Sequence, residues 1–211
     1  MERGQFISIE GIEGVGKSTN IAVIIDCIEA AGHKVVSTRE PGGTPLAEDI
    51  RDLLVNRSDE PIPETAELLL MFAARSLLVN NVIIPALEAG SWVVCDRFTD
   101  SSRAYQGGGR GVPMETIDRL ADWVHGDVWP DLTILLDAPV EIGMQRASKR
   151  GAPDRFELER HDFFQRVREC YLSLAAREPE RFIVIDTSQP LGDVMTEVRR
   201  IMEQLVSDVS P

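Results

Sequence analysis

The chain alternates short, almost wholly apolar runs with longer stretches in which apolar residues recur every three or four positions. Runs of the first kind are typical of strands buried on both faces, and stretches of the second kind are typical of helices with one buried face. The runs that predict strands cover residues 6–10, 34–38, 92–96, 132–137 and 182–186. The alternation predicts an α/β fold of three layers, with a parallel five-stranded sheet covered by helices on both faces.

Helical periodicity fills the intervals between these runs. The first helix is predicted from Ile21, Ile24, Ile25 and Ile28, which recur at helical spacing, and it is expected to end at Gly32. A long helix is predicted from Glu64 towards Ala89, with Pro85 expected to kink or interrupt it. The remaining predicted helices cover about 114–124, 140–147 and 157–177, followed by a last helix with Val194, Val198, Ile201 and Leu205 on one face. The stretch 99–111, rich in glycine and polar residues, is predicted to be a loop.

Length and composition favour a single soluble domain spanning 1–211. The chain has 211 residues, 43% of them hydrophobic and 27% charged, which is an ordinary globular balance for one domain. Uninterrupted apolar runs such as 134–136 fall far short of the roughly 18 residues that a membrane span needs. We therefore expect no membrane insertion.

Charge and cysteine usage narrow the partners and the compartment. With 22 basic and 35 acidic residues, the net charge of −13 argues against binding to a nucleic acid backbone. Cys27, Cys95 and Cys170 are widely spaced and lie in apolar stretches. They are interpreted as buried thiols in a reducing compartment, and the expected location is the cytoplasm.

A phosphate-binding pattern follows the first predicted strand. Residues 11–18 read Gly-Ile-Glu-Gly-Val-Gly-Lys-Ser and fit G-x-x-x-x-G-K-[ST], placed between a strand and a helix as the mechanism requires. The backbone N–H groups of such a loop surround phosphate oxygens, Lys17 reaches the transferred phosphate and Ser18 offers an oxygen to Mg²⁺. The residues predicted to bind ATP are Gly11, Ile12, Glu13, Gly14, Val15, Gly16, Lys17, Ser18 and Thr19.

Further motifs separate the classes of P-loop protein. The chain has no N-K-x-D and no D-x-x-G motif, which argues against a Ras-type GTPase. Four other motifs are present: Thr-Arg-Glu-Pro-Gly-Gly-Thr at 38–44, Phe-Ala-Ala-Arg at 72–75, Asp-Arg-Phe at 96–98, and Tyr-Gln-Gly-Gly-Gly-Arg-Gly at 105–111. In this order and spacing they resemble the thymidylate kinase family, in its bacterial form, over essentially the whole chain. The resemblance implies a P-loop nucleoside monophosphate kinase fold, transfer of the γ-phosphate of ATP to dTMP with Mg²⁺ in the supply of dTTP, and a homodimer packed through helices.

Three cations are expected at one edge of the sheet. Lys17, Arg39 and Arg97 follow three separate predicted strands, and the carboxyl ends of parallel strands meet at one edge. By resemblance, Arg39 and Arg97 hold the acceptor phosphate, with Arg97 close to the transfer site. Asp96 is expected to organise Mg²⁺ and its waters or to order Arg97. A cap for the following turn is the alternative for Asp96.

The acceptor nucleotide has its own predicted residues. Phe72 and Arg75 are one helical turn apart and share a face. By resemblance, Phe72 stacks on thymine, Arg75 hydrogen-bonds its O4, Ser102 contacts the base, Tyr105 crowds the sugar C2′, and Glu13 contacts the 3′-hydroxyl and an arginine. Core packing is the alternative for Phe72 and Tyr105. The residues predicted to bind dTMP are Glu13, Arg39, Phe72, Arg75, Arg97, Ser102, Tyr105 and Gln106.

The basic segment at about 146–157 resembles a mobile lid. Many relatives outside the bacterial group carry an arginine inside the P-loop where this chain has Val15, so a cation on the donor side must come from elsewhere. Arg150 is the first choice and Lys149 the second, with Arg155 as a third candidate; a solvated basic loop is the alternative. The motif at 96–98 departs from the family, which often has Tyr or His where Phe98 stands, so no polar role passes to Phe98.

Two other functions stay open at this point. One is a related kinase acting on another nucleoside monophosphate. The other is a regulatory nucleotide-binding module without turnover, against which the presence of Lys17, Ser18, Arg39, Asp96 and Arg97 argues.

Overall fold

A computed structural model describes residues 3–56, 60–149 and 155–209. Five parallel strands form one sheet in the order β2-β3-β1-β4-β5. They are β1 (Phe6–Glu10), β2 (Val35–Arg39), β3 (Trp92–Asp96), β4 (Leu132–Asp137) and β5 (Phe182–Asp186). All five predicted strands are confirmed, and β2 lies one residue later than expected.

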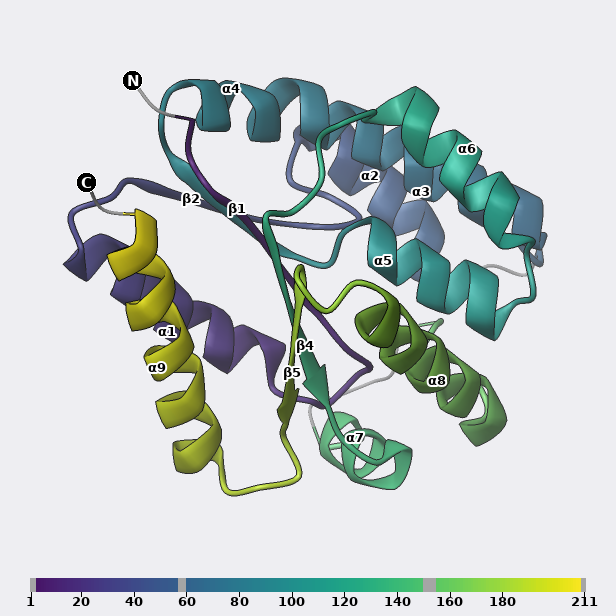
Figure 1. Cartoon of the computed structure of the whole chain (residues 1–211). Coiled ribbons are helices and arrows are strands. Elements are labelled where there is room, and N and C mark those ends of the chain that lie inside the picture. Colours follow the sequence, from purple (N-terminus) through teal and green to yellow (C-terminus); the bar gives the residue numbers. More distant parts are fainter. Residues whose placement is uncertain (1–2, 57–59, 150–154, 210–211) are drawn as a thin grey trace.

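Helices cover both faces of the sheet (Figure 1). One face carries α1 (Lys17–Ala30) and α9 (Leu191–Val209), which pack side by side. The other face carries α3 (Glu64–Leu78), α4 (Ile84–Glu88) and α8 (His161–Arg177). Outside α3 lie α2 (Pro45–Val55) and α6 (Met114–Val124), and α7 (Val140–Ala147) follows β4. The predicted three-layer α/β fold is confirmed.

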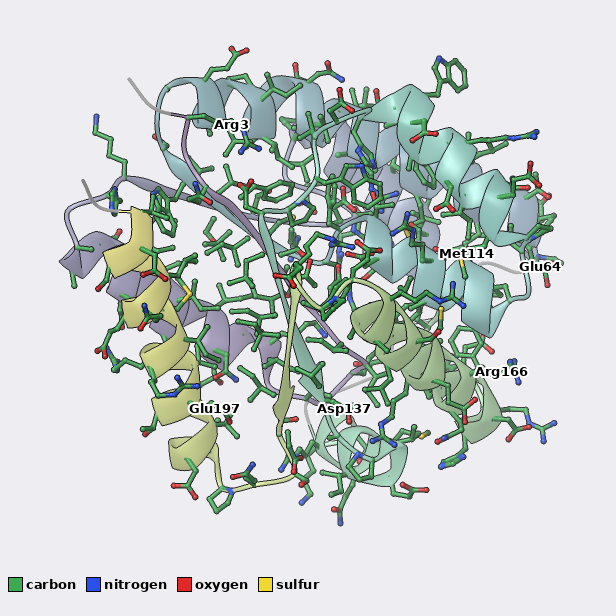
Figure 2. All side chains as sticks on the ribbon, viewed as in Figure 1. Arg3, Glu64, Met114, Asp137, Arg166 and Glu197 are labelled. Atoms are coloured by element: carbon green, nitrogen blue, oxygen red, sulfur yellow. The ribbon has the colours of Figure 1, made fainter. Side chains whose placement is uncertain are left out.

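The apolar residues of the strands explain why both faces are covered. Ile7 and Ile9 belong to a buried cluster with residues of α1 and α9, whereas Phe6 belongs to a second cluster with residues of α4, of the end of α3 and of the segment that joins them. Burying each such side chain contributes roughly 1.5–3 kcal/mol, which favours helices packed on both faces of the central strands. Side chains accordingly fill the space between the sheet and the helices on both sides (Figure 2).

The segment 99–111 is helical, and the prediction of a loop there is wrong. It forms α5 (Thr99–Ser102) and a π-helical segment, η2 (Arg103–Gly109). A Cβ on Gly108 would collide with Cys170, and a Cβ on Gly109 with Phe163, both on α8. These glycines therefore allow η2 to approach α8 closely, and they do not make a turn.

Two other helices differ from the sequence prediction. Helix α2 was not predicted at all; its N-terminus is capped by Thr44, whose Oγ1 accepts the Ala47 N–H at 3.3 Å. The helix expected from 157 begins at His161. The interruption expected at Pro85 takes the form of a π-helical segment, η1 (Val79–Ile83), just before α4.

By length and composition, one helix among the described residues could cross a membrane: the continuous run Glu64–Glu88. No single apolar run in this helix is long enough to span a membrane. Its hydropathy averaged over 18 residues is nevertheless high, because few of the polar residues between the apolar ones are charged. Its residues Leu78 and Ile83 are fully buried against the sheet, as in the core helix of a soluble protein.

The three free cysteines are not equally buried. Cys27 and Cys95 are buried, as expected, whereas Cys170 on α8 is only half-buried, which corrects that prediction.

The carboxyl ends of β1, β2 and β3 lie next to one another. Arg39 at the end of β2 is level with Asp96 at the end of β3, and Asp96 is level with Ile9 in β1. The P-loop begins directly after β1. The chemistry-bearing motifs are therefore brought to one edge of the sheet, as predicted.

Candidate active site

The P-loop joins β1 to α1. Gly16 precedes α1 with φ +93°, and a Cβ on Gly14 would collide with the backbone of Gly143 on α7, so the loop needs glycine at both positions. Lys17 Nζ donates to the carbonyls of Gly11 (3.3 Å) and Ile12 (3.1 Å). Burial, helped by the nearby charge of Arg97, lowers the pKa of Lys17 to about 8.

Two pockets meet at the P-loop and share three charged residues, Glu13, Arg51 and Arg97. The P-loop pocket is lined by Glu13, Gly14, Gly16, Lys17, Ser18, Arg51, Asp96 and Arg97. The central pocket is lined by Glu13, Glu40, Pro41, Arg51, Val55, Met71, Arg75, Arg97, Ser101, Ser102, Tyr105, Gln106 and Phe156. The shared residues form the boundary across which a group could pass from one pocket to the other.

Arg97 stands at that boundary in an unusual backbone conformation. Its φ is +72°, in the left-handed region that residues other than glycine seldom adopt. Arg97 Nη2 donates to Glu13 Oε1 at 2.9 Å and to the Tyr105 hydroxyl at 3.1 Å, and the same hydroxyl donates to Glu13 at 2.8 Å. Surrounding negative and hydroxyl groups raise the pKa of Arg97, so the side chain stays charged.

A buried ion pair forms one wall of the central pocket. The guanidinium of Arg75 donates to both oxygens of Glu40, the shortest contact being 2.6 Å, and to Ser102 Oγ at 3.0 Å. Both side chains of the pair are 5% exposed or less. Burial raises the pKa of Glu40, an effect that Arg75 opposes. Arg75 Nη1 is buried without a hydrogen-bond partner among the described residues, which leaves a donor for a polar ligand.

Comparisons with known proteins identify the family. The family model for thymidylate kinase matches residues 9–198. The chain is 53% identical to the thymidylate kinase of Alkalilimnicola ehrlichii, over 98% of this chain and 96% of that protein. The chain belongs to the thymidylate kinase family.

Further relatives agree with this assignment. The thymidylate kinase of Methylococcus capsulatus is 53% identical over 98% of this chain and 99% of its own. The crystal structure of thymidylate kinase from Ehrlichia chaffeensis superposes with a TM-score of 0.76 at 34% identity, covering 95% of this chain and 99% of that one. The resemblance stated from the motifs is therefore confirmed, and so is the α/β P-loop fold.

The residues predicted to bind ATP do not all face the P-loop pocket. Ile12 and Val15 are buried in the hydrophobic core at 3% and 1% exposure, so only their backbone can serve a nucleotide. Thr19 instead lines a neighbouring cavity beside α1 and α9, called here the α9 pocket, which shares Gly14 and Gly16 with the P-loop pocket. Its lining residues are Gly14, Val15, Gly16, Thr19, Asn20, Arg146, Thr187, Gln189, Leu191 and Val194.

The residues predicted for the acceptor nucleotide divide into two groups. Glu13, Arg75, Arg97, Ser102, Tyr105 and Gln106 all line the central pocket. Phe72 does not line it; its buried ring lies under the Arg75 guanidinium at 4.5 Å, and the neighbouring Met71 faces the pocket instead. Arg39 lies outside both pockets with about half of its side chain exposed, and it pairs with Glu48 at 2.8 Å.

Ser18 and Asp96, the predicted Mg²⁺ ligands, both line the P-loop pocket. Asp96 Oδ1 is buried without a hydrogen-bond partner among the described residues, and both side chains offer the oxygen atoms that Mg²⁺ prefers. No group of three or more His, Cys, Asp and Glu side chains within the described parts of the chain could hold a metal alone. The residues therefore fit a Mg²⁺ ion that takes its other ligands from water and substrate phosphates.

The predicted lid residues are separated in space. Lys149 is exposed just after α7, and Arg150 lies outside the described residues. Arg155 donates to the Leu54 carbonyl at 2.7 Å and to Glu67 at 2.6 Å, which places it against α2 and α3. In this conformation Arg155 is not among the residues of the P-loop pocket.

Sequence reasoning missed several residues of the site. Arg51 lines both pockets and donates to the Pro41 carbonyl at 3.0 Å, but it comes from α2, the helix that was not predicted. The Thr44-Pro45 pair at its start is a helix-start signal that could have shown it. Glu40 and Ser101 lie inside or beside recognised motifs, yet nothing in the motifs shows that they line the pocket.

Proposed function

We propose that the central pocket binds dTMP and the P-loop pocket the phosphates of ATP, within a single catalytic domain. As a member of the thymidylate kinase family, the protein is a nucleoside monophosphate kinase that transfers the γ-phosphate of ATP to dTMP. The observation that supports the site assignment is the shared boundary of the two pockets, where Arg51 and Arg97 face both. Two phosphate groups repel each other, and cations at their meeting point offset that repulsion.

The geometry supports a role for each of these groups. Lys17 and the P-loop N–H groups would hold the β- and γ-phosphates, and Arg51 and Arg97 the acceptor phosphate between the pockets. Ser18 and Asp96 would hold Mg²⁺, which would neutralise charge on the transferred group. Arg75, with its free Nη1, would donate to the thymine base, and Ser102 lies beside it. The adenine of ATP would occupy the α9 pocket, where Arg146 is fixed by its bond to the Thr187 carbonyl at 2.8 Å.

The structure weakens two of the predicted contacts. Arg39 is paired with Glu48 outside both pockets, so a role on the phosphate requires that ion pair to open. Phe72 would act by supporting the Arg75 guanidinium in place of a direct stack on the base.

The direct test is a coupled assay of ADP release with dTMP, dUMP, AMP and GMP as acceptors. dTMP is expected to give the highest kcat/KM. Preferred turnover of another monophosphate would assign the central pocket to that nucleotide, and absence of ADP release with every acceptor would support a regulatory module.

Tyr105 is expected to help exclude ribonucleotides. Its ring borders the central pocket among Phe156, Phe163 and Tyr171, and its hydroxyl binds Glu13 and Arg97. Tyr105→Ala should lower the preference for dTMP over ribothymidine monophosphate by about tenfold or more, because space opens for the 2′-hydroxyl. Tyr105→Phe keeps the ring and should keep the preference, with a kcat lower by several-fold. Equal preference in wild type and Tyr105→Ala would make the ring a packing residue only.

The lid is expected to supply a cation to the donor side. Replacing Lys149 and Arg150 with alanine should lower kcat by about tenfold to a thousandfold with little change in the KM for dTMP, as loss of charge-stabilising donors does. Arg155→Ala is the control, because Arg155 binds Glu67 and the Leu54 carbonyl. A full kcat in the double variant together with a loss in Arg155→Ala would assign the role to Arg155.

We also propose that the enzyme works in the cytoplasm as a homodimer packed through helices, without nucleic acid or membrane partners. Support comes from exposed apolar side chains on the packed helices α2, α3 and α6, with Trp123 at 84% exposure and Leu53 and Leu69 above 50%. Light scattering at enzyme concentrations used in the assay would report the mass.

A further inference from the structure

A fully buried carboxylate stands directly before the P-loop. Glu10, the last residue of β1, is 0% exposed. Its Oε1 accepts the Phe98 N–H at 2.7 Å, and its Oε2 accepts the hydroxyls of Ser101 (2.6 Å) and Tyr171 (2.8 Å). An acid this deep is costly unless it is well hydrogen-bonded. None of the roles assigned above uses it.

The two hydroxyls connect Glu10 to Arg97. Ser101 Oγ and Tyr171 Oη lie 2.8 Å from each other, and each is 3.3 Å from Arg97 Nη1. A hydroxyl has one proton to donate. While Ser101 and Tyr171 give theirs to the ionised Glu10, their oxygen lone pairs are left to accept from the Arg97 guanidinium.

Arg97 needs such support because its backbone is strained. A non-glycine residue at φ +72° persists only where its surroundings hold it in place. The Nη2 side of the guanidinium is held by Glu13 and Tyr105, and the Nη1 side by the Gly11 carbonyl at 2.9 Å and by the two hydroxyls. The Nη1 side is thus held by hydroxyls from α5 and α8, and both hydroxyls are oriented by the one carboxylate at the end of β1.

We propose that Glu10 is a positioning residue for phosphoryl transfer, holding Arg97 against the acceptor phosphate through the hydroxyls of Ser101 and Tyr171. The proposal rests on the proposed function, in which Arg97 contacts that phosphate. Glu10 touches neither substrate; it fixes the direction of two hydrogen bonds and thereby the place of the guanidinium.

Protonation of Glu10 would undo this arrangement. A neutral carboxyl must donate its own proton to one of the hydroxyls, which reverses at least one hydrogen bond among Glu10, Ser101 and Tyr171 and removes the negative charge that attracts Arg97. The groups that face Glu10 are Asp100 and Arg97 around the start of α5, Tyr171 on α8, Lys17 on α1 and Cys95 on β3, while Leu135 of β4 is apolar. Burial and the charge of Asp100 raise the pKa of Glu10 to about 7. The active, ionised form is therefore lost as the pH falls through neutrality.

The test compares wild type with Glu10→Gln and Tyr171→Phe across pH 5.5 to 8.5. Wild-type kcat should fall as the pH is lowered below neutrality; this fall is called here the acid limb. Glu10→Gln should have a kcat lower by about ten- to a hundredfold, as for a misplaced catalytic group, and its pH profile should lack the acid limb. The KM for ATP should not change in either variant. Tyr171→Phe removes one hydroxyl while keeping the buried ring and should lower kcat by about two- to tenfold.

Thermal unfolding shows whether Glu10 itself titrates. Its folded pKa lies above the ordinary value of 4.5, so ionisation costs the wild type stability as the pH rises from about 4.5 through 7. The Tm of Glu10→Gln relative to wild type should therefore increase from pH 5 to pH 8. A residue that served only the fold would give lower stability without loss of kcat per folded molecule.

Two control variants use buried polar residues near Glu10. Ser8 lies two residues earlier on β1 and bonds Thr133 at 2.9 Å, so Ser8→Ala should keep both kcat and the acid limb. Asp100 is fully buried and pairs with Arg103 and Arg181, so Asp100→Asn should keep the plateau of kcat while moving the acid limb to lower pH. If Glu10→Gln has an unchanged kcat, or still loses kcat at acid pH as the wild type does, the role of Glu10 is overturned while the proposed function stands. Absence of dTMP-dependent ADP release by the wild type would overturn the proposed function, and this proposal with it.

Discussion

Replacing Lys17 with alanine is expected to lower kcat by about a hundred- to a thousandfold while the protein remains folded. Its ammonium group sits among the carbonyls of Gly11 and Ile12, at the pocket that Ser18 and Asp96 also line. Charge develops on the transferred phosphoryl group, and loss of one donor aimed at such charge costs about 2.7–4 kcal/mol. The fold should survive, because burial already disfavours the charged form of Lys17 and lowers its pKa to about 8.

The measurement is the coupled assay of ADP release together with a thermal unfolding curve. Lys34→Ala is the matched control, since Lys34 is exposed and lies just before β2, at the end of the strand far from the P-loop. A folded Lys17→Ala variant with unchanged kcat would contradict the assignment of the P-loop pocket to phosphate.

Arg75→Ala is expected to cost both stability and dTMP binding. Removing the guanidinium leaves the carboxylate of Glu40 buried and unpaired, and breaking such a pair costs about 3–5 kcal/mol. For a chain of this length the loss corresponds to a fall in Tm of roughly 6–20 °C. A simple alanine variant would therefore mix a folding defect with a binding defect.

The double variant Glu40→Gln with Arg75→Met separates the two effects. Removing both charges should restore much of the stability, because replacement of a buried ion pair by neutral groups is often close to neutral. The KM for dTMP should still rise by about ten- to a hundredfold, as for loss of a hydrogen bond from a charged group, with the KM for ATP unchanged. Equal increases in the two KM values would remove Arg75 from the base site.

The strands and the placement of the site were predictable because they depend on local pattern. Apolar runs such as 132–137 can be satisfied only in a sheet covered on both faces, and parallel strands bring the residues that follow them to one edge. Lys17, Asp96 and Arg97 were found in this way.

The helix at 99–111 and several site contacts could not be predicted, because they depend on tertiary contacts that no local sequence pattern contains. Three successive glycines at 107–109 suggest a flexible loop, but Gly108 and Gly109 permit close packing of η2 on α8, and Gly107 permits close packing on α6. The family resemblance implied that Phe72 stacks on the base, but its neighbour Met71 reaches the pocket. Glu40 and Arg75 are 35 positions apart, and their ion pair exists only once α3 lies against the loop that follows β2.

The shared boundary of the two pockets makes their occupancies interdependent. Glu13, Arg51 and Arg97 line both, so a substrate that reorders any of them in one pocket changes the free energy of binding in the other. Such coupling is reciprocal: ATP must alter the affinity for dTMP by the same factor by which dTMP alters the affinity for ATP. A sequence change at any of these three side chains therefore alters the walls of both pockets at once.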